Sequence, residues 1–314
     1  MLRLRRARWS PGRSVMAVVL VALALAGAAR PPSETAFKRG VHEGRVYRLY
    51  LPKALVEGAS DPTVSLVLAL HGCWQTPEDF AAGTRLNEVA EQRGLAVLYP
   101  AQSKLANASR CWNWFAPASR GAGEVAQLVR LVETVRAEHP LRSGLTVVGF
   151  SAGAFMAVNL ACVAPDVVTG VGAAAGGPFQ CGVGALGGLQ CMRGHHGRGE
   201  AAAAACVAAG PRPARPPRVS LWHGQEDVVV NPSNLDALAE MFAKVTAATN
   251  RSDESRDGVR RWVYRTAASR PLVESWLVPG MGHAWSGGDQ RGTHTFPSGP
   301  NATERMLDFL LRAE

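Results

Sequence analysis

The chain contains 314 residues, of which 47% are hydrophobic and 19% are charged, so it is long enough to bury a large core. Its 34 lysine and arginine residues outnumber its 25 acidic residues and give a formal net charge of +9. Five of the arginines lie in residues 1–13, and removing residues 1–28 lowers the charge to +4. The other basic residues are scattered and form no stripe with aromatic residues, which excludes nucleic-acid binding as the function.

The N-terminus has the pattern of a secretory signal peptide. Basic residues 1–13 precede an apolar run of about 15 residues, which is short for a membrane span of roughly 20. Small residues at 26–28 suit a signal peptidase, so we predict cleavage near Ala28. The expected product is a secreted single α/β domain over residues 29–314 with no stable membrane association. The alternative interpretation is an uncleaved membrane anchor.

Hydrophobic periodicity predicts alternating strands and helices along this domain. Residues 46–51 suggest an antiparallel edge strand, and 64–70 a buried central strand. A helix over 77–94 ends at a glycine and leads into a buried strand at 95–99. Strand, helix and strand in succession predict a parallel crossover. Further helices are expected at 124–138, 231–247 and 303–311, and further strands at 145–150, 219–223 and 275–278.

Residues 149–153 read Gly-x-Ser-x-Gly between a predicted strand and a predicted helix. This pattern indicates a nucleophile elbow, in which small residues accommodate the strained turn around the serine. An α/β-hydrolase presents its serine, acid and histidine in that chain order. Two adjacent acids, Glu226 and Asp227, follow the strand at 219–223, and His283 follows the strand at 275–278. The order therefore predicts an α/β-hydrolase fold with Ser151 as nucleophile.

The strand at 64–70 ends in His-Gly-Cys, the kind of junction that supplies an oxyanion-hole donor in this fold. We expect the backbone N–H groups of Cys73 and Ala152 to stabilise the oxygen of the tetrahedral intermediate, because fixed dipoles need no reorganisation there. Three tryptophans close to the site in sequence are candidates to line a substrate pocket, although such residues often belong to the core instead. They are Trp112, Trp114 and Trp285.

The six cysteines are an even number in a chain predicted to be exported, which favours disulfides. Cys73 and Cys111 both follow predicted strand ends on the active-site side, so we expect them to pair. Cys162 is either bridged or a buried free thiol. Residues 176–217 lose all periodicity and form a cysteine-bearing insertion, either a lid or a variable loop. Within it, Cys191 and two histidines, His195 and His196, are an incomplete ligand set, so no metal is expected.

Four stretches resemble one family beyond the catalytic pattern. They are HGCWQTPEDF at 71–80, CWNWF at 111–115, GFSAG at 149–153 and GHAWSGG at 282–288. The chain resembles the polyhydroxybutyrate (PHB) depolymerase family of secreted esterases, whose relatives include feruloyl and acetyl-xylan esterases. The resemblance spans roughly residues 45–311.

The resemblance implies Ser151 as nucleophile, Asp227 rather than Glu226 as the acid, and His283 as general base and acid, with Cys73 in the oxyanion hole. It implies two-step ester hydrolysis, without metal or organic cofactor, of short 3-hydroxybutyrate oligomers or polymer. Feruloyl or acetyl-xylan esters are the alternative substrates, and a non-catalytic binding protein is the alternative class. The insertion and the expected lack of an appended polymer-binding domain argue against action on solid polymer. The other histidines, including His71, His139, His223 and His294, are expected to lie outside the triad.

Overall fold

The computed structural model describes residues 37–56, 64–118, 121–197, 199–211, 213–256 and 258–312. The signal peptide predicted over residues 1–28 lies outside these ranges. Within them, no helix combines the length and the apolar composition needed to cross a membrane.

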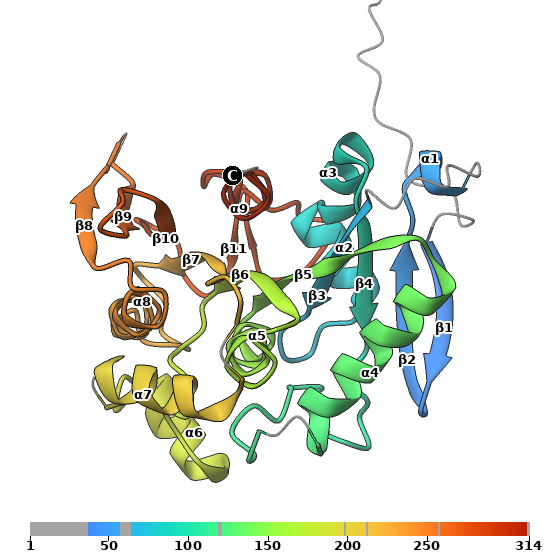
Figure 1. Cartoon of the computed structure of the whole chain (residues 1–314), viewed down its shortest axis with the longest axis horizontal. Helices are drawn as coiled ribbons and strands as arrows, with labels where there is room; N and C mark the ends of the chain where they lie inside the picture. Colours follow the sequence, from blue (N-terminus) through green and yellow to red (C-terminus); the bar gives the residue numbers. More distant parts are fainter. Residues whose placement is uncertain are drawn as a thin grey trace, which may run out of the picture. The chain divides into compact units, whose positions relative to one another are not determined.

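A ten-stranded sheet forms the centre of the described unit (Figure 1). The strands are β1 (Phe37–His42), β2 (Arg45–Tyr50), β3 (Val64–Leu70), β4 (Ala96–Pro100), β5 (Leu141–Phe150), β6 (Val168–Ala174), β7 (Arg218–Gly224), β8 (Asn250–Asp253), β9 (Arg260–Arg265) and β10 (Pro271–Val278). Their order is β1-β2-β4-β3-β5-β6-β7-β10-β9-β8, and the run from β4 to β10 is parallel throughout. Antiparallel strands flank this run on both sides. The predicted mostly parallel sheet is confirmed.

Helices cover both faces of the sheet. They are α1 (Lys53–Val56), α2 (Pro77–Thr84), α3 (Leu86–Arg93), α4 (Gly123–Glu138), α5 (Ala152–Val163), α6 (Gly184–Met192), α7 (Gly199–Ala209), α8 (Ser233–Val245) and α9 (Ala302–Leu310). Figure 1 shows α2, α3 and α9 on one side of the sheet and α4, α5 and α8 on the other, with α6 and α7 outside α5 and α8. A separate short pair, β11 (Trp285–Ser286) and β12 (Thr295–Phe296), follows the main sheet.

The two helical layers bury two separate hydrophobic clusters. Strand β3 supplies both, because side chains alternate between the faces of a strand. Leu66, Leu68 and Leu70 pack with residues of α4, α5 and α8, whereas Val67 and Ala69 pack with residues of α2, α3 and α9. The sheet is therefore buried on both faces, as parallel sheets require.

The prediction of one helix over 77–94 is wrong, because this segment forms two helices, α2 and α3. Arg85 between them adopts a left-handed conformation with φ of 55°, which ends α2. The break lets Phe80 and Leu86 enter the same hydrophobic cluster from different helices. Gly83 lies two residues before this point, but it is accommodated inside α2, and the helical periodicity extends across the break.

The predicted edge strand at 46–51 is β2, which is antiparallel as expected but lies between β1 and β4. The edge position was wrong because β1, with its largely polar sequence, gives little strand signal. Strand β6 was also not predicted. Its glycines lie against α9, where a Cβ at Gly172 would be 2.9 Å from the Met306 sulfur. Because this close packing requires glycine, small residues occupy positions in β6 where bulky residues would usually indicate a strand.

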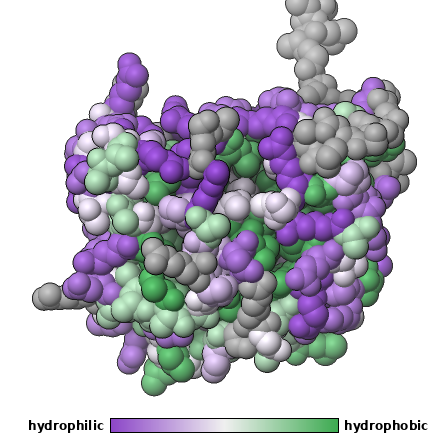
Figure 2. All heavy atoms as spheres, viewed as in Figure 1, coloured by the Kyte–Doolittle hydropathy of each residue, from purple (hydrophilic) through white to green (hydrophobic). Residues whose placement is uncertain are grey.

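Residues 176–217 contain α6 and α7, although the sequence there shows no helical periodicity. Helix α7 packs against α8 and α5. Hydrophobic side chains reach the surface over α6 and α7, as Figure 2 shows, and among them are the exposed Val183, Leu186 and Val207. These two helices expose apolar residues on one side and pack alanines on the other, so neither has a clear polar face. This explains why the sequence shows no amphipathic periodicity there.

Candidate active site

The Gly-x-Ser-x-Gly segment forms a tight turn between β5 and α5. Ser151 has φ of 54° and ψ of −123°, a strained conformation for a residue with a side chain. A Cβ at Gly149 would lie 2.2 Å from the Gly153 carbonyl oxygen, and one at Gly153 would lie 2.0 Å from that of Leu70. These backbone contacts therefore require both glycines, and Gly153 allows the start of α5 to lie directly against the end of β3.

Ser151, His283 and Asp227 form a continuous hydrogen-bonded chain. His283 Nε2 lies 2.9 Å from Ser151 Oγ, and His283 Nδ1 lies 2.7 Å from Asp227 Oδ2. A carboxylate can only accept, so Nδ1 carries the proton and Nε2 is left to accept from the serine hydroxyl. A nucleophile, a base and an acid that orients the base are thereby brought together.

The loops that carry the acid and the histidine touch each other. Gln225 donates its backbone N–H to Val278 O at 2.9 Å, and Glu226 donates its own to Met281 O at 2.9 Å. A Cβ at Gly224 would lie 2.2 Å from Met281 O, so only glycine allows this approach. Asp227 and His283 are 56 residues apart in the sequence, and backbone hydrogen bonds between their loops bring them together.

Asp227 is buried and held from several directions. Its Oδ1 accepts the backbone N–H groups of Val229 and Val230, each at 2.9 Å. Burial on its own would raise the pKa of Asp227, but hydrogen bonds from His223 and His283 outweigh it and hold the pKa well below its ordinary value. The neighbouring Glu226 is exposed, and its side chain makes no hydrogen bond or ion pair with any of the described residues. The geometry therefore favours Asp227 over Glu226.

The loop after β3 supplies the second half of the site. Gly72 donates its N–H to Gln75 Oε1 at 2.9 Å, and Trp74 donates to Ser109 O at 2.7 Å. Between them, the N–H of Cys73 has no acceptor among the described residues, and neither does that of Ala152 at the start of α5. Two unpaired donors beside the serine suit an oxyanion, and Ala152 adds the favourable end of a helix dipole.

A disulfide joins Cys73 to Cys111, which confirms that prediction. Buried polar groups hold the same two loops together. His71 Nδ1 donates to Gly72 O at 2.8 Å, and its Nε2 accepts the Gln102 N–H at 3.1 Å. Burial lowers the pKa of His71 to about 4. His71 is thus a neutral structural residue beneath the oxyanion loop.

Glu124, in the first turn of α4, organises the loop that carries Cys111. Its carboxylate accepts the backbone N–H of Asn113 at 2.8 Å and the Asn113 side-chain amide at 2.9 Å. Gln102 Nε2 makes a further bond to it. Sequence reasoning missed this network because its members are far apart in the chain and no local motif connects them.

The three candidate pocket tryptophans are core residues in this structure. Trp112 is 0% exposed and donates its Nε1–H to His71 O, while Trp285 is 3% exposed and donates to Thr303 Oγ1. Trp114 is 8% exposed and stacks on Phe155 with ring centroids 3.9 Å apart. Burial and hydrogen bonding place Trp112 and Trp285 in the core, and contact with a substrate stays a prediction for the three tryptophans.

The other cysteines are also paired. Cys162 bonds to Cys206, so it is not a free thiol, and Cys181 bonds to Cys191. The Cys191 sulfur is therefore not available to a metal together with His195 and His196. Three disulfides are typical of proteins from oxidising compartments.

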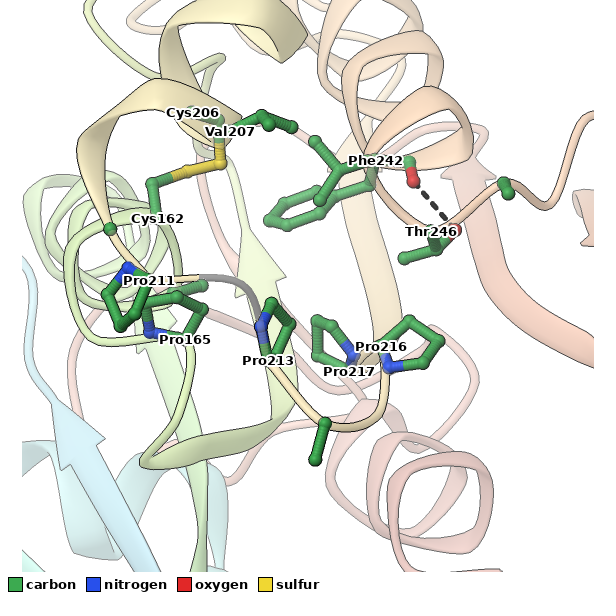
Figure 3. Close-up of a pocket in the computed structure, with 15 residues that line it drawn as sticks. Cys162, Pro165, Cys206, Val207, Pro211, Pro213, Pro216, Pro217, Phe242 and Thr246 are labelled. Carbon is green, nitrogen blue, oxygen red and sulfur yellow. Dashed lines mark hydrogen bonds between the residues drawn. A yellow bond between two sulfur atoms is a disulfide. The ribbon is translucent and has the colours of Figure 1, made fainter.

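A cavity of about 480 Å³ lies beside the Cys162–Cys206 bridge. Figure 3 shows its wall of prolines facing Phe242. Cys162 is near the C-terminal end of α5, whereas Ser151 directly precedes the first residue of that helix. At 1.5 Å per helical residue the two ends are about 16 Å apart, so this cavity is not the active site.

Helix α6 contacts the loop that carries Cys111, because a Cβ at its Gly188 would lie 3.2 Å from Phe115. The lid over 176–217 stays a prediction, with a variable surface loop as its alternative.

Comparisons with known proteins show the family and the fold of the chain. The family model described as Esterase PHB depolymerase matches residues 45–263. Poly(3-hydroxyalkanoate) depolymerase C from Paucimonas lemoignei is 33% identical over 244 residues, covering 73% of this chain and 58% of that protein. Feruloyl esterase B from Thermothelomyces thermophilus is 24% identical, covering 75% of this chain and 82% of that protein. The structure of an acetyl xylan esterase from Aspergillus awamori matches with a TM-score of 0.65 at 18% identity, covering 79% of this chain and 93% of that one.

The chain spans little more than half the length of the P. lemoignei depolymerase. It spans 28% of the poly(3-hydroxybutyrate) depolymerase of Ralstonia pickettii, to which it is 36% identical over 135 residues, or 38% of this chain. The matched family model covers most of the described sheet and includes the proposed nucleophile and acid. The chain therefore belongs to the PHB depolymerase family of esterases, which are carboxylic ester hydrolases with the α/β-hydrolase fold.

Proposed function

We propose that this protein is a secreted serine esterase that hydrolyses esters of 3-hydroxyalkanoates, most readily 3-hydroxybutyrate oligomers, through an acyl-enzyme. The observation that carries the proposal is the chain of hydrogen bonds from Ser151 through His283 to Asp227, at 2.9 and 2.7 Å. This arrangement can activate a serine hydroxyl without a metal or an organic cofactor.

In the proposed mechanism, Ser151 Oγ attacks the ester carbonyl while His283 Nε2 takes its proton. The N–H groups of Cys73 and Ala152 stabilise the negative charge that develops on the carbonyl oxygen. His283 then gives the proton to the leaving alkoxide, and the alcohol departs. Water repeats the cycle on the acyl-enzyme and releases the acid. Asp227 remains ionised and stabilises the imidazolium in both steps.

The substrate class rests on the relatives and on the apolar surface beside the catalytic loops. A poly(3-hydroxyalkanoate) depolymerase is among the proteins to which the chain is most similar by identity. Trp74, next to the oxyanion loop, is 68% exposed, and Val228 and Val229, next to Asp227, are 95% and 46% exposed. Exposed apolar side chains on these two loops suit an aliphatic polyester. Feruloyl or acetyl-xylan esters are the second candidate, since relatives with those names also match.

We further propose that residues 1–28 are a signal peptide and that residues 29–314 are a single catalytic domain acting outside the cytoplasm. The three disulfides support export. A non-catalytic binding protein is disfavoured, because such a protein has no need to keep Ser151 in a strained turn beside a correctly oriented histidine.

The test is hydrolysis by residues 29–314 of p-nitrophenyl butyrate, 3-hydroxybutyrate oligomers, methyl ferulate and acetylated xylan, each compared with Ser151→Ala. We expect turnover of the oligomers and its loss in the variant. A preference for ferulate or acetyl-xylan would reassign the substrate. If folded protein hydrolyses none of these esters, or if Ser151→Ala keeps more than a trace of activity, the proposal fails.

A further inference from the structure

A second histidine, His294, stands beside the catalytic one. The imidazole rings of His294 and His283 are 6.1 Å apart between centroids and lie edge to face at 75°. Phe150 packs against both, with centroids 4.8 Å from His283 and 5.9 Å from His294. His294 is exposed, whereas only 11% of the His283 side chain is exposed. His294 therefore lies at the open side of the site and takes no part in the triad.

The backbone of His294 is held in an unfavourable conformation. Its φ is 54°, in the left-handed region that residues with side chains seldom adopt. The carbonyl oxygen of His294 accepts the Trp285 N–H at 2.7 Å. On the preceding residue, Thr293 donates its N–H to Asp79 Oδ1 at 2.9 Å and its hydroxyl to Asp79 Oδ2 at 2.6 Å. Strain of this kind persists only where the surroundings enforce it, and it is concentrated at functional sites.

The same contacts tie His294 to the oxyanion loop. Gln75, which is 3% exposed, accepts the Gly72 N–H at 2.9 Å through Oε1 and donates through Nε2 to Thr293 O at 3.2 Å. One side chain thus links the loop that would bind the oxyanion to the residue that precedes His294. The backbone that carries His294 is therefore fixed relative to the reacting centre.

The chemistry of acyl transfer places the alcohol half of the substrate next to His283. His283 Nε2 must protonate the leaving oxygen, so that oxygen lies within hydrogen-bond reach of Nε2. The atoms beyond the leaving oxygen must lie on the open side of the site, and His294 is exposed there. In an ester of a 3-hydroxyacid, the alcohol half carries a carbonyl carbon three bonds from the leaving oxygen. A hydrogen-bond donor beside His283 is suitably placed to meet it.

We propose that His294 binds this carbonyl group and so selects esters whose alcohol half is itself a 3-hydroxyacyl unit. The inference rests on the proposed function and assigns a specificity-determining residue to that site. Burial, and then the charge on His283, lower the pKa of His294 against the opposing effects of Asp79 and of a hydrogen bond to the His283 backbone, which favours the neutral imidazole. No residue of the triad provides such recognition, because each is engaged with another.

The test compares two butanoate esters that differ only in the carbonyl group of the alcohol half. 4-Oxohexan-2-yl butanoate carries the carbonyl three bonds from the leaving oxygen, and 2-hexyl butanoate has a methylene in its place. His294→Gly removes the imidazole, and glycine adopts φ of 54° without strain, so the fold is retained. His294→Asn also tolerates this conformation and keeps an N–H donor. Ser269→Gly, with φ of 61° in an exposed turn between β9 and β10, is the matched control for relief of strain.

We expect His294→Gly to lower kcat/KM for the carbonyl-bearing ester by about three- to tenfold, the worth of one hydrogen bond, mainly through KM. Turnover of 2-hexyl butanoate should stay within about twofold of wild type, because no bond to its alcohol half is lost. His294→Asn should recover part of the loss, and Ser269→Gly should change neither ester. An equal loss on both esters would overturn the inference in favour of a structural role, and no loss on either would exclude contact.

The wild-type protein gives two further checks. It should prefer the carbonyl-bearing ester, and equal turnover of the pair, or turnover of neither, would overturn the role of His294. Failure to hydrolyse 3-hydroxybutyrate oligomers, combined with a His294-dependent preference within the butanoate pair, would instead reject the proposed substrate and keep the role of His294. The two proposals can thus fail separately.

Discussion

Asp227→Asn is the sharpest perturbation of the proposed triad, because the structure dictates how the new amide must lie. Oδ1 of Asp227 accepts two backbone N–H groups, from Val229 and Val230, so the asparagine carbonyl oxygen must take that position. The amide NH₂ then faces His283 Nδ1, where Asp227 Oδ2 accepts at 2.7 Å. Two donors would meet.

The conflict is relieved if His283 moves its proton from Nδ1 to Nε2. Nε2 then donates and can no longer accept the proton of Ser151, which lies 2.9 Å away. The serine loses its general base while every backbone contact of the loop is kept. We therefore expect kcat/KM to fall on the order of 10,000-fold, about 5.5 kcal/mol of transition-state stabilisation.

The assay is the initial rate on p-nitrophenyl butyrate, with thermal unfolding followed by circular dichroism to show that the variant is folded. Glu226→Gln is the matched control, since its exposed side chain lies one residue away and should leave the rate unchanged. A folded Asp227→Asn variant within about tenfold of wild type would refute the tautomer argument. Loss in Glu226→Gln instead would move the acid to that residue.

Two further predictions concern the loops beneath the oxyanion hole. The Cys73–Cys111 and Cys162–Cys206 bridges span 38 and 44 residues, so removing either with paired alanines should cost about 4 kcal/mol in urea unfolding, but only the first should also reduce esterase activity. Equal activities of the two variants would argue against a role for the first bridge in the site. Burial lowers the pKa of His71 from 6.5 to about 4, so the unfolded chain takes up this proton at a higher pH than the folded chain. The wild-type protein should therefore lose roughly 3 kcal/mol of unfolding free energy as the pH falls from 6.5 to 4. His71→Gln should show a shallower loss in the same titration of unfolding free energy, and an identical pH dependence would contradict the assignment.

The elements that could be predicted from the sequence are those specified by local chemistry. Gly149 and Gly153 indicate the turn in the sequence, because a Cβ at either position would lie within 2.2 Å of a backbone oxygen. Chain order then restricts the acid and the histidine to loops after two buried strands. The Cys73–Cys111 pair could be anticipated because both residues follow strands whose ends lie on the same edge of a parallel sheet.

The elements that could not be predicted depend on contacts between distant segments. Trp112 and Trp285 are near the site in sequence, but which way an indole points is decided by partners such as His71 and Thr303. The residues that fix the oxyanion loop show the same limit. Gln75 and Thr293 are separated by 218 positions, and no periodicity or motif connects them.

The catalytic geometry results from loop-to-loop contact more than from any single loop. The N-terminus of α5 lies against the end of β3 because Gly153 has no side chain, and the acid loop reaches the histidine loop because Gly224 has none. Gln75 then joins the oxyanion loop to the segment of His294. The first two contacts join backbone atoms, whose positions vary less than those of long side chains, and the third uses a buried side chain that bonds a backbone group at each end. A site assembled in this way holds the reacting groups in place while the exposed side chains around it, such as His294, remain free to determine which ester is accepted.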